Sequence, residues 1–211
     1  MDYGKAIELF RRAAAQGQAS AQCSLGLMYD NGWAVSKDPV EANAWYQKAA
    51  KNGDPDAMYD LGRSAAQGSG MPQDQAKAFT WYQKAANCGL VRAELEVGYS
   101  YYNGIGVGKN PVAGVVWYRA AAKQGDVRAI ADIGIAYMEG NGVDSDLVEA
   151  FGWLDVARFA TQLSQNDMRF KWGVRRYLDD LKKEISPAQL KLGEARSRQL
   201  YEELRPKITS R

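Results

Sequence analysis

Residues 21–53 read AQCSLGLMYDNGWAVSKDPVEANAWYQKAAKNG, and their pattern returns three more times along the chain. Identical residues lie 36 positions apart in three independent sets: Trp45, Trp81, Trp117 and Trp153; Gly26, Gly62, Gly98 and Gly134; and Ala21, Ala57, Ala93 and Ala129. Three sets with one spacing indicate a repeat protein. A single repeat of this size cannot bury its apolar face alone, so the repeats are expected to stack on one another.

Each repeat is predicted to form two helices joined by a short loop. Small and apolar residues recur at helical spacing over residues 21–31, and Gly32 is expected to end this first helix in a left-handed conformation. Asp38 is expected to cap the second helix, with Glu41 three residues later closing a capping box. The predicted fold class is therefore all-α.

The glycine inside each first helix needs a packing reason, because glycine costs roughly 1 kcal/mol relative to alanine in a helix. The second helix carries a Trp-Tyr pair, as at Trp45 and Tyr46, and a ring from this pair is expected to approach the glycine closely. We interpret all six tryptophans as core residues. Stacking of such hairpins predicts a right-handed α-α superhelix, a solenoid of 36-residue helix-turn-helix repeats with a C-terminal helical cap.

The repeat register divides the chain into three predicted segments. Residues 1–17 match the second helix of a repeat alone and form an N-terminal half repeat, and residues 18–163 hold four repeats. Residues 164–211 are expected to form capping helices, one starting at Asp167 and one opened by Ser186 and ending near Leu204. A polar outer face on the last unit is a general need of solenoids, and the charge of this tail supplies it.

The composition excludes several classes of function. The chain of 211 residues is 46% hydrophobic and 25% charged and contains no histidine, which removes the commonest general base and the usual zinc ligand. No catalytic residue, metal ligand or cofactor is predicted. The glycines of Gly104-Ile105-Gly106-Val107 lie between two helices and are interpreted as turn residues rather than a phosphate loop. Cys23 and Cys88 occupy different repeat positions and are expected to stay unpaired.

The charge distribution bears on the partner. Residues 1–168 carry 15 Lys and Arg against 19 Asp and Glu, whereas residues 169–211 carry 12 against 6. A mildly acidic body argues against a nucleic-acid groove, and no segment is apolar enough for membrane insertion. The compartment is left open: as written, the sequence predicts a soluble cytoplasmic protein, and removal of a signal sequence would instead indicate the periplasm. The oligomeric state is also left open.

The motif A-x-x-x-L-G-x-x-Y-x-x-G, from Ala21 to Gly32, is followed by D-x-x-x-A-x-x-W-Y-x-x-A-A-x-x-G, from Asp38 to Gly53. Together they resemble the Sel-1-like repeat, a relative of the tetratricopeptide repeat. The resemblance covers residues 3 to about 163 and implies a bacterial helical repeat protein that binds other proteins. It implies no particular activity.

The first helices carry a stripe of variable residues that is expected to line the concave side. Asp60, Glu96 and Asp132 would form an acidic ladder with rungs roughly 10 Å apart, and Leu27, Tyr99 and Ile135 are expected to be exposed apolar anchors. The predicted partner-binding residues are Leu27, Asp60, Arg63, Glu96, Tyr99, Tyr102, Asp132, Ile135, Met138 and Glu139.

Three functions follow from these observations. The first is a non-catalytic scaffold, an adaptor or regulator, that binds a partner protein on its concave face. The second is an immunity protein or inhibitor that neutralises a bacterial toxin or a secreted effector enzyme such as a lipase, its acidic ladder clamping a basic rim. The third, an enzyme acting on cell-wall material or a lactam, is suggested only by claims for the family, and the missing histidine weighs against it.

Overall fold

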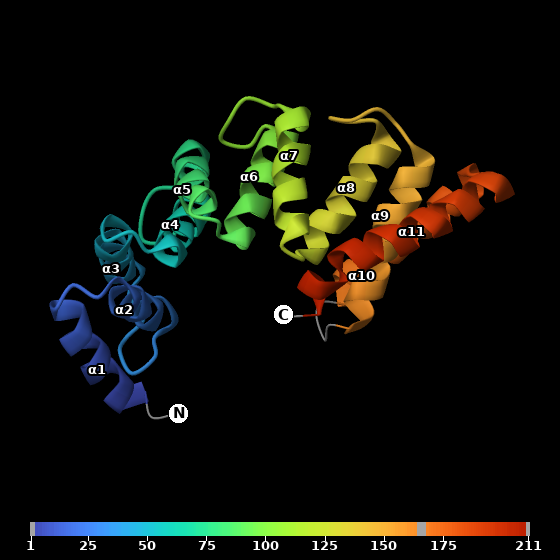
Figure 1. The fold of residues 1–211 in the computed structure, drawn as a ribbon. Coiled ribbons are helices and arrows are strands. Elements are labelled where there is room, and N and C mark those ends of the chain that lie inside the picture. Colours follow the sequence, from blue (N-terminus) through green and yellow to red (C-terminus); the bar gives the residue numbers. More distant parts are fainter. Residues whose placement is uncertain (1–2, 164–167, 210–211) are drawn as a thin grey trace. The chain divides into compact units, whose positions relative to one another are not determined.

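The structure is a computed structural model that describes residues 3–163 and 168–209. Within these ranges the chain forms eleven helices and no strand, which confirms the predicted all-α class. The helices, drawn in Figure 1, are α1 (Tyr3–Ala15), α2 (Ala19–Asn31), α3 (Pro39–Lys51), α4 (Pro55–Gln67), α5 (Gln75–Asn87), α6 (Val91–Asn103), α7 (Pro111–Lys123), α8 (Val127–Glu139), α9 (Leu147–Leu163), α10 (Met168–Glu184) and α11 (Pro187–Ile208).

The chain divides into two compact units. The first consists of Met1–Val97 with Ile105–Val107, and the second of Gly98–Gly104 with Gly108–Arg211. The first unit therefore contains α1 to α5 and the start of α6, and the second contains the end of α6 and α7 to α11.

The hairpins of the first unit begin and end at the signals read from the sequence. Gly32 follows α2 with φ 75°, and the Asp38 side chain caps α3 by accepting a hydrogen bond from the Glu41 amide at 3.0 Å. The predicted capping box does not form. The Asp38 amide instead donates to the Tyr29 carbonyl at 2.8 Å, which ties the start of α3 to the end of α2.

A glycine in each first helix contacts a ring or side chain of the second helix, as predicted. A Cβ built on Gly62 would lie 2.5 Å from the Tyr82 ring, and one on Gly26 would collide with Tyr46 in the same way. In the second unit, a Cβ built on Gly98 would lie 2.6 Å from the Tyr118 ring, and one built on Gly134 would lie 2.7 Å from the Leu154 side chain. The tyrosine or leucine at this repeat position is buried every time. Glycine is therefore required because only a bare Cα leaves room for it.

The tryptophans differ from the sequence interpretation. Trp153 is buried, but the equivalent Trp45, Trp81 and Trp117 are only half-buried. Trp33, in the loop after α2, and Trp172, on α10, are exposed, so the interpretation of all six as core residues is wrong. The tyrosine that follows each repeat tryptophan takes the central core position, because it faces the helical glycine.

The loops inside the α4–α5, α6–α7 and α8–α9 hairpins each contact the hairpin before them. Gly70 has φ 67°, and a Cβ there would collide with the Pro39 carbonyl at the start of α3. Gly106 lies against the Gln75 carbonyl in the same way. Ala34 occupies the same repeat position with φ 61°, the one positive φ at a non-glycine residue within the described ranges.

Ala34→Gly is expected to raise the free energy of unfolding by about 1 kcal/mol, because a side chain in the left-handed region is penalised by roughly that amount. Urea unfolding followed by circular dichroism measures the change. Gly70→Ala is the matched control and should have the opposite sign, since it combines the same backbone penalty with a collision against Pro39. Unchanged stability of Ala34→Gly would show that the loop relaxes without cost.

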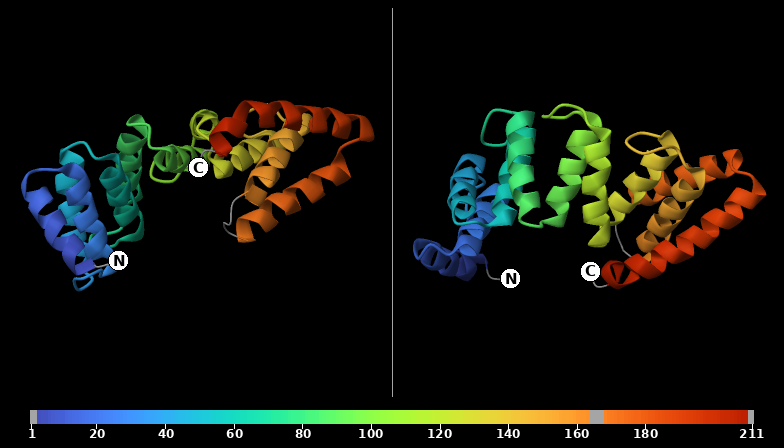
Figure 2. Two further views of the ribbon diagram at one scale, coloured as in Figure 1. Left: turned by 60° about the horizontal axis from the view of Figure 1, so that its bottom comes forward. Right: turned by 45° about the horizontal axis from the view of Figure 1, so that its top comes forward.

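The last two helices pack on the last hairpin of the second unit. Both views in Figure 2 show α10 and α11 beside α9. Gly193 of α11 lies against Phe151 of α9, and Arg196 Nε donates to Glu149 Oε1 at 2.7 Å. The outer face of α9 is thereby covered by helices outside the repeat pattern. The predicted start at Asp167 lies outside the described residues, and α11 continues to Ile208 instead of ending near Leu204.

Candidate functional site

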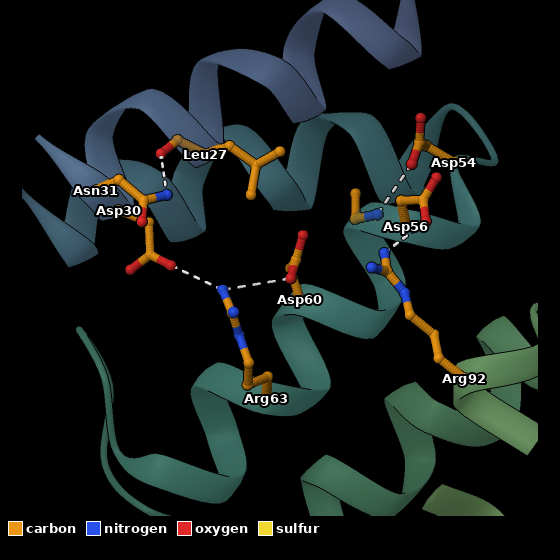
Figure 3. A network of polar contacts seen from close by, with 9 residues as sticks. Leu27, Asp30, Asn31, Asp54, Asp56, Asp60, Arg63 and Arg92 are labelled. Carbon is orange, nitrogen blue, oxygen red and sulfur yellow. Dashed lines mark hydrogen bonds and ion pairs between the residues drawn. The ribbon is translucent and has the colours of Figure 1, made fainter. Parts of the chain in front are cut away.

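Asp30, Asp60 and Arg63 form a charged group in the first unit, which we call the α2–α4 cluster (Figure 3). Arg63 Nη2 lies 2.8 Å from Asp30 Oδ2 on α2 and 3.3 Å from Asp60 Oδ1 on its own helix α4. The Arg63 guanidinium therefore forms ion pairs with two carboxylates, one on each of two neighbouring first helices.

Asp60 is the most buried member of this cluster, with only 4% of its surface exposed. Burial raises the pKa of its carboxyl to about 6, and Arg63 and Arg92 oppose this shift while Asp30 and Asp56 add to it. The two guanidinium groups therefore do not fully offset the effect of burial on the Asp60 carboxylate. This differs from the sequence expectation of a solvated acidic rung, because the α4 position of Asp60 faces the neighbouring helix as well as the surface.

The raised pKa of Asp60 predicts that the protein loses stability as pH rises through about 6. The folded state binds this proton more tightly than the unfolded chain, in which the carboxyl has a pKa of 3.8. The resulting contribution to the free energy of unfolding is therefore complete below pH 3.8 and is lost above about pH 6. Between pH 5 and pH 8 the loss from Asp60 should be about 1 kcal/mol.

Urea unfolding at the two pH values tests this dependence. Asp60→Asn should reduce the difference in unfolding free energy between pH 5 and pH 8 by that amount. Asp56→Asn, at an exposed residue one helical turn closer to the start of α4, should reduce the difference much less, because Asp56 makes only a small contribution to the raised pKa of Asp60. An equal effect of the two substitutions would contradict the assignment to Asp60.

A second set of charges lies beside the cluster, at the start of α4 and α6. Arg92 of α6 pairs with Asp56 of α4 and lies over the Tyr59 ring, with its Cζ 4.4 Å from the ring centroid. Asp54 caps α4 by accepting from the Ala57 amide at 2.9 Å. Figure 3 shows Asp54, Asp56 and Asp60 along one side of α4, with Arg63 and Arg92 pointing towards them. Carboxylates outnumber guanidinium groups on this surface.

The second unit carries a surface of different character, which we call the Tyr99 surface and which consists of Tyr99, Tyr102, Ile135, Met138 and Glu139. The Tyr102 hydroxyl donates to Glu139 Oε2 at 2.9 Å and so joins α6 to α8. Tyr99 lies one turn before Tyr102 on α6, and Ile135 lies one turn before Glu139 on α8. Tyr99 and Ile135 therefore belong to the two helix faces that the Tyr102–Glu139 hydrogen bond joins. Tyr99 is 49% exposed, whereas Ile135 and Met138 are half-buried.

Asp132 lies one turn before Ile135 on α8. Burial is the main reason that the pKa of its carboxyl rises to about 7; Asp126 adds to the shift and Arg128 opposes it. Burial thus raises the pKa of both Asp60 and Asp132, and at neutral pH it is Asp132 whose negative charge is reduced by partial protonation.

The other predicted binding residues are placed as follows. Leu27 is half-buried and packs on an apolar cluster that includes Tyr46 and Leu61. Ile135 is also half-buried, so the expectation of an exposed anchor is wrong for both residues. Glu96 is half-buried on α6, in the first unit with Asp60, while Asp132 belongs to the second unit. The acidic ladder over all three residues stays a prediction.

Sequence reasoning missed Asp30, which holds Arg63 from the neighbouring helix. The signal was present, because Asp30 is 72 residues before Tyr102 and 108 before Met138 and so shares their repeat position. Both later residues were selected for being aromatic or apolar. A carboxylate at this position gains its role only from the arginine that α4 brings to it.

Across residues 3–163 and 168–209, no group of three or more His, Cys, Asp or Glu side chains is arranged to hold a metal ion. No helix in this part of the chain has both the length and the hydrophobicity needed to cross a membrane. Cys23 and Cys88 are both free thiols, as predicted, the first buried and the second exposed. Burial raises the pKa of the Cys23 thiol, which makes it a poor nucleophile.

Comparison with known proteins gives one family. The Sel1 repeat model matches residues 2–18, 19–54, 55–90, 91–126 and 127–157. The crystal structure of a Sel1 repeat protein from Oxalobacter formigenes is similar with a TM-score of 0.68 and 31% identity, covering 89% of this chain and 87% of that chain. Among curated proteins, none matches this chain.

Two further solved structures share the fold. The protective antigen c5321 of uropathogenic Escherichia coli has a TM-score of 0.58 and 28% identity, and the match covers 98% of this chain but 50% of that one. The immunity protein Pa5087 from Pseudomonas aeruginosa has a TM-score of 0.50 and 22% identity, covering 85% of this chain and 74% of that chain. At this identity the second likeness shows the fold alone.

Proposed function

Because the chain belongs to the Sel1 repeat family, whose members generally mediate protein–protein interactions and are typically non-catalytic, we propose that it is a scaffold that binds a partner protein. The partner would bind first helices of the hairpins, namely the end of α6 and α8 in the second unit. The protein then acts as an adaptor or regulator by binding this partner.

The observation that carries this proposal is the Tyr99 surface. Tyr99 is 49% exposed on a helix whose other apolar residues are buried or half-buried, and the half-buried Ile135 and Met138 extend the apolar area onto α8. Tyrosine provides a large contact area with little loss of conformational entropy, and a few such residues contribute most of the binding energy in protein interfaces. The polar ends of Tyr102 and Glu139 border this area and supply hydrogen-bonding groups.

The charges of the first unit support a basic partner. Asp56 is exposed, and the α2–α4 cluster keeps two carboxylates around one guanidinium. Surface charge of one sign steers an oppositely charged partner and selects against others. Binding should therefore weaken as salt is raised, because exposed charges are screened beyond about 8 Å at physiological ionic strength.

Site-specific photocrosslinking in cells tests the proposal. A photoreactive phenylalanine analogue placed at Tyr99 should capture one protein, which mass spectrometry identifies. The same analogue at Val116, an exposed apolar residue on the second helix of the same hairpin, is the matched control and should not capture it. Capture at Val116 with none at Tyr99 would place the interface on the second helices and contradict the proposal.

Tyr99→Ala should weaken binding of the purified partner by about tenfold, the loss of roughly 1.4 kcal/mol that is typical of an important interface aromatic. Val116→Ala should leave the dissociation constant unchanged. Because Tyr99 is half exposed, its removal should not alter the helical content, and circular dichroism checks this.

The identity of the captured protein decides between the adaptor and the inhibitor. A secreted effector enzyme whose activity falls on binding would identify an immunity protein, whereas a regulatory protein whose activity is unaffected or redirected would identify an adaptor. The likeness to an immunity protein extends to the fold alone, so we take the adaptor or regulator as the proposed function.

A further inference from the structure

The first half of α10 exposes large apolar side chains that the repeat fold does not use. Met168 is 71% exposed and Trp172 is 70% exposed, the two highest values among the large hydrophobic residues of the described ranges. They are four residues apart and so lie next to each other on one helix face. Exposed tryptophan on a helix that already has a buried face needs a separate explanation.

This face points away from the rest of the second unit. Val174, Leu178 and Leu181 are the buried residues of α10, and helical spacing puts Met168 and Trp172 on the opposite side. The exposed pair therefore forms a ridge on a single helix. Both side chains keep most of their surface exposed, so no helix of the described residues covers them.

Arginines flank the ridge on both sides. Arg175 lies on one side of Trp172, and Arg176 on the other, by the helical spacing of 100° per residue. Residues 168–178 contain four Arg and Lys and no Asp or Glu. The first carboxylate that faces Arg176 is Asp180, at 3.9 Å, and this carboxylate is held more closely by Lys183 at 2.7 Å. The side chain of Arg176 is 86% exposed, so its charge is available to a ligand.

We infer that this α10 ridge, defined by Met168, Trp172, Arg175 and Arg176, binds the anionic headgroups of a phospholipid surface. Tryptophan prefers the boundary between lipid and water, and arginines beside it pair with lipid phosphates. A flat, deformable surface accommodates a convex ridge, whereas a folded protein would need a matching groove. Each basic residue near an anionic membrane adds about 1 kcal/mol, so the association is expected to be reversible.

Flotation of the full chain with lipid vesicles tests this inference. The protein should float with vesicles containing about one-third phosphatidylglycerol, stay unbound with vesicles of phosphatidylcholine alone, and dissociate at high salt. Trp172→Ala and Arg175→Glu/Arg176→Glu should each weaken binding by about tenfold or more. Tryptophan emission should shift to shorter wavelength on binding in the wild type, and this shift should be absent in Trp172→Ala.

Matched variants separate the ridge from general effects of charge or aromatic loss. Arg11→Glu/Arg12→Glu changes two exposed arginines of α1 and lowers the net charge equally, and Trp33→Ala removes the other exposed tryptophan of the described ranges. Both should bind vesicles as the wild type does. The substituted α10 residues are exposed, so helical content should be unchanged in all four variants.

Three results would overturn the inference. The wild type could fail to bind the anionic vesicles, the α10 variants could bind as well as the wild type, or the α1 charge variant could lose binding to the same extent, which would indicate attraction by net charge alone. Binding to soluble polyglutamate that depends on Trp172, without binding to vesicles, would instead assign the ridge to an acidic protein segment.

Discussion

Gly62→Val is expected to lower the free energy of unfolding by at least about 3 kcal/mol, the largest effect among the substitutions considered for this fold. A Cβ at Gly62 would lie 2.5 and 2.6 Å from two carbons of the Tyr82 ring, far inside van der Waals contact. Tyr82 is itself buried, so the ring has no free space to move into. The branched side chain of valine adds two more methyl groups at the same place, and α4 and α5 must separate to admit it.

Gly173→Val is the matched control. Gly173 is also a helical glycine, but nothing lies within 4 Å of a Cβ built there, so the same substitution should change stability by less than about 0.5 kcal/mol. Urea unfolding of both variants measures the contrast. In a Tyr82→Ala background the cost of Gly62→Val should fall by at least about 1 kcal/mol, because the ring it collides with is gone. Equal costs in both backgrounds would contradict the steric explanation.

Arg63→Ala is expected to cost about 2 kcal/mol at pH 8. It removes the guanidinium that lies 2.8 Å from Asp30 and 3.3 Å from Asp60, and it leaves the buried Asp60 carboxylate without its nearest cation. The cost is expected below that of a fully buried ion pair, because 37% of the Arg63 side chain is exposed and water replaces part of the interaction.

The pH dependence of this cost distinguishes electrostatics from packing. Loss of Arg63 raises the pKa of Asp60 further, so Asp60 is protonated at pH 5 and the penalty there should be smaller than at pH 8. Arg92→Ala breaks an exposed pair with Asp56 and should cost about 1 kcal/mol or less. Its cost should change less between the two pH values than that of Arg63→Ala, because Arg92 affects the pKa of Asp60 less than Arg63 does. A cost of Arg63→Ala that is the same at pH 5 and pH 8 would contradict the electrostatic assignment.

Much of the fold was predictable because the repeat makes local and tertiary signals agree. The position of Gly32 predicted the end of α2, Asp38 predicted the cap of α3, and the helical glycines predicted close packing against the following helix. The capping box failed for a tertiary reason, since the Asp38 amide is used by the Tyr29 carbonyl across the loop. Periodicity identifies which residues share a face, but it does not say which of two adjacent aromatics meets the glycine.

The candidate sites were less predictable than the fold. Tyr99 is exposed as expected from its place outside the buried ladder, but Leu27 is half-buried and Asp60 is buried, although all three belong to equivalent helices. Exposure at these positions depends on the side chains of the neighbouring hairpin, which vary between repeats. Trp172 was interpreted as a core residue together with the other five tryptophans, and only the packing of Val174, Leu178 and Leu181 shows that it lies on the outer side.

The sequence by itself determined the helices, their ends, the hairpin pairing and the family, because a 36-residue period repeats every local signal and each signal acts over one or two helical turns. Only the tertiary structure decided that Arg63 pairs with Asp30 as well as Asp60 and that Asp60 is buried. It also decided that the α10 ridge is exposed. These properties arise from the distances between helices and from the removal of water, and neither is encoded in the spacing of residues along one chain segment.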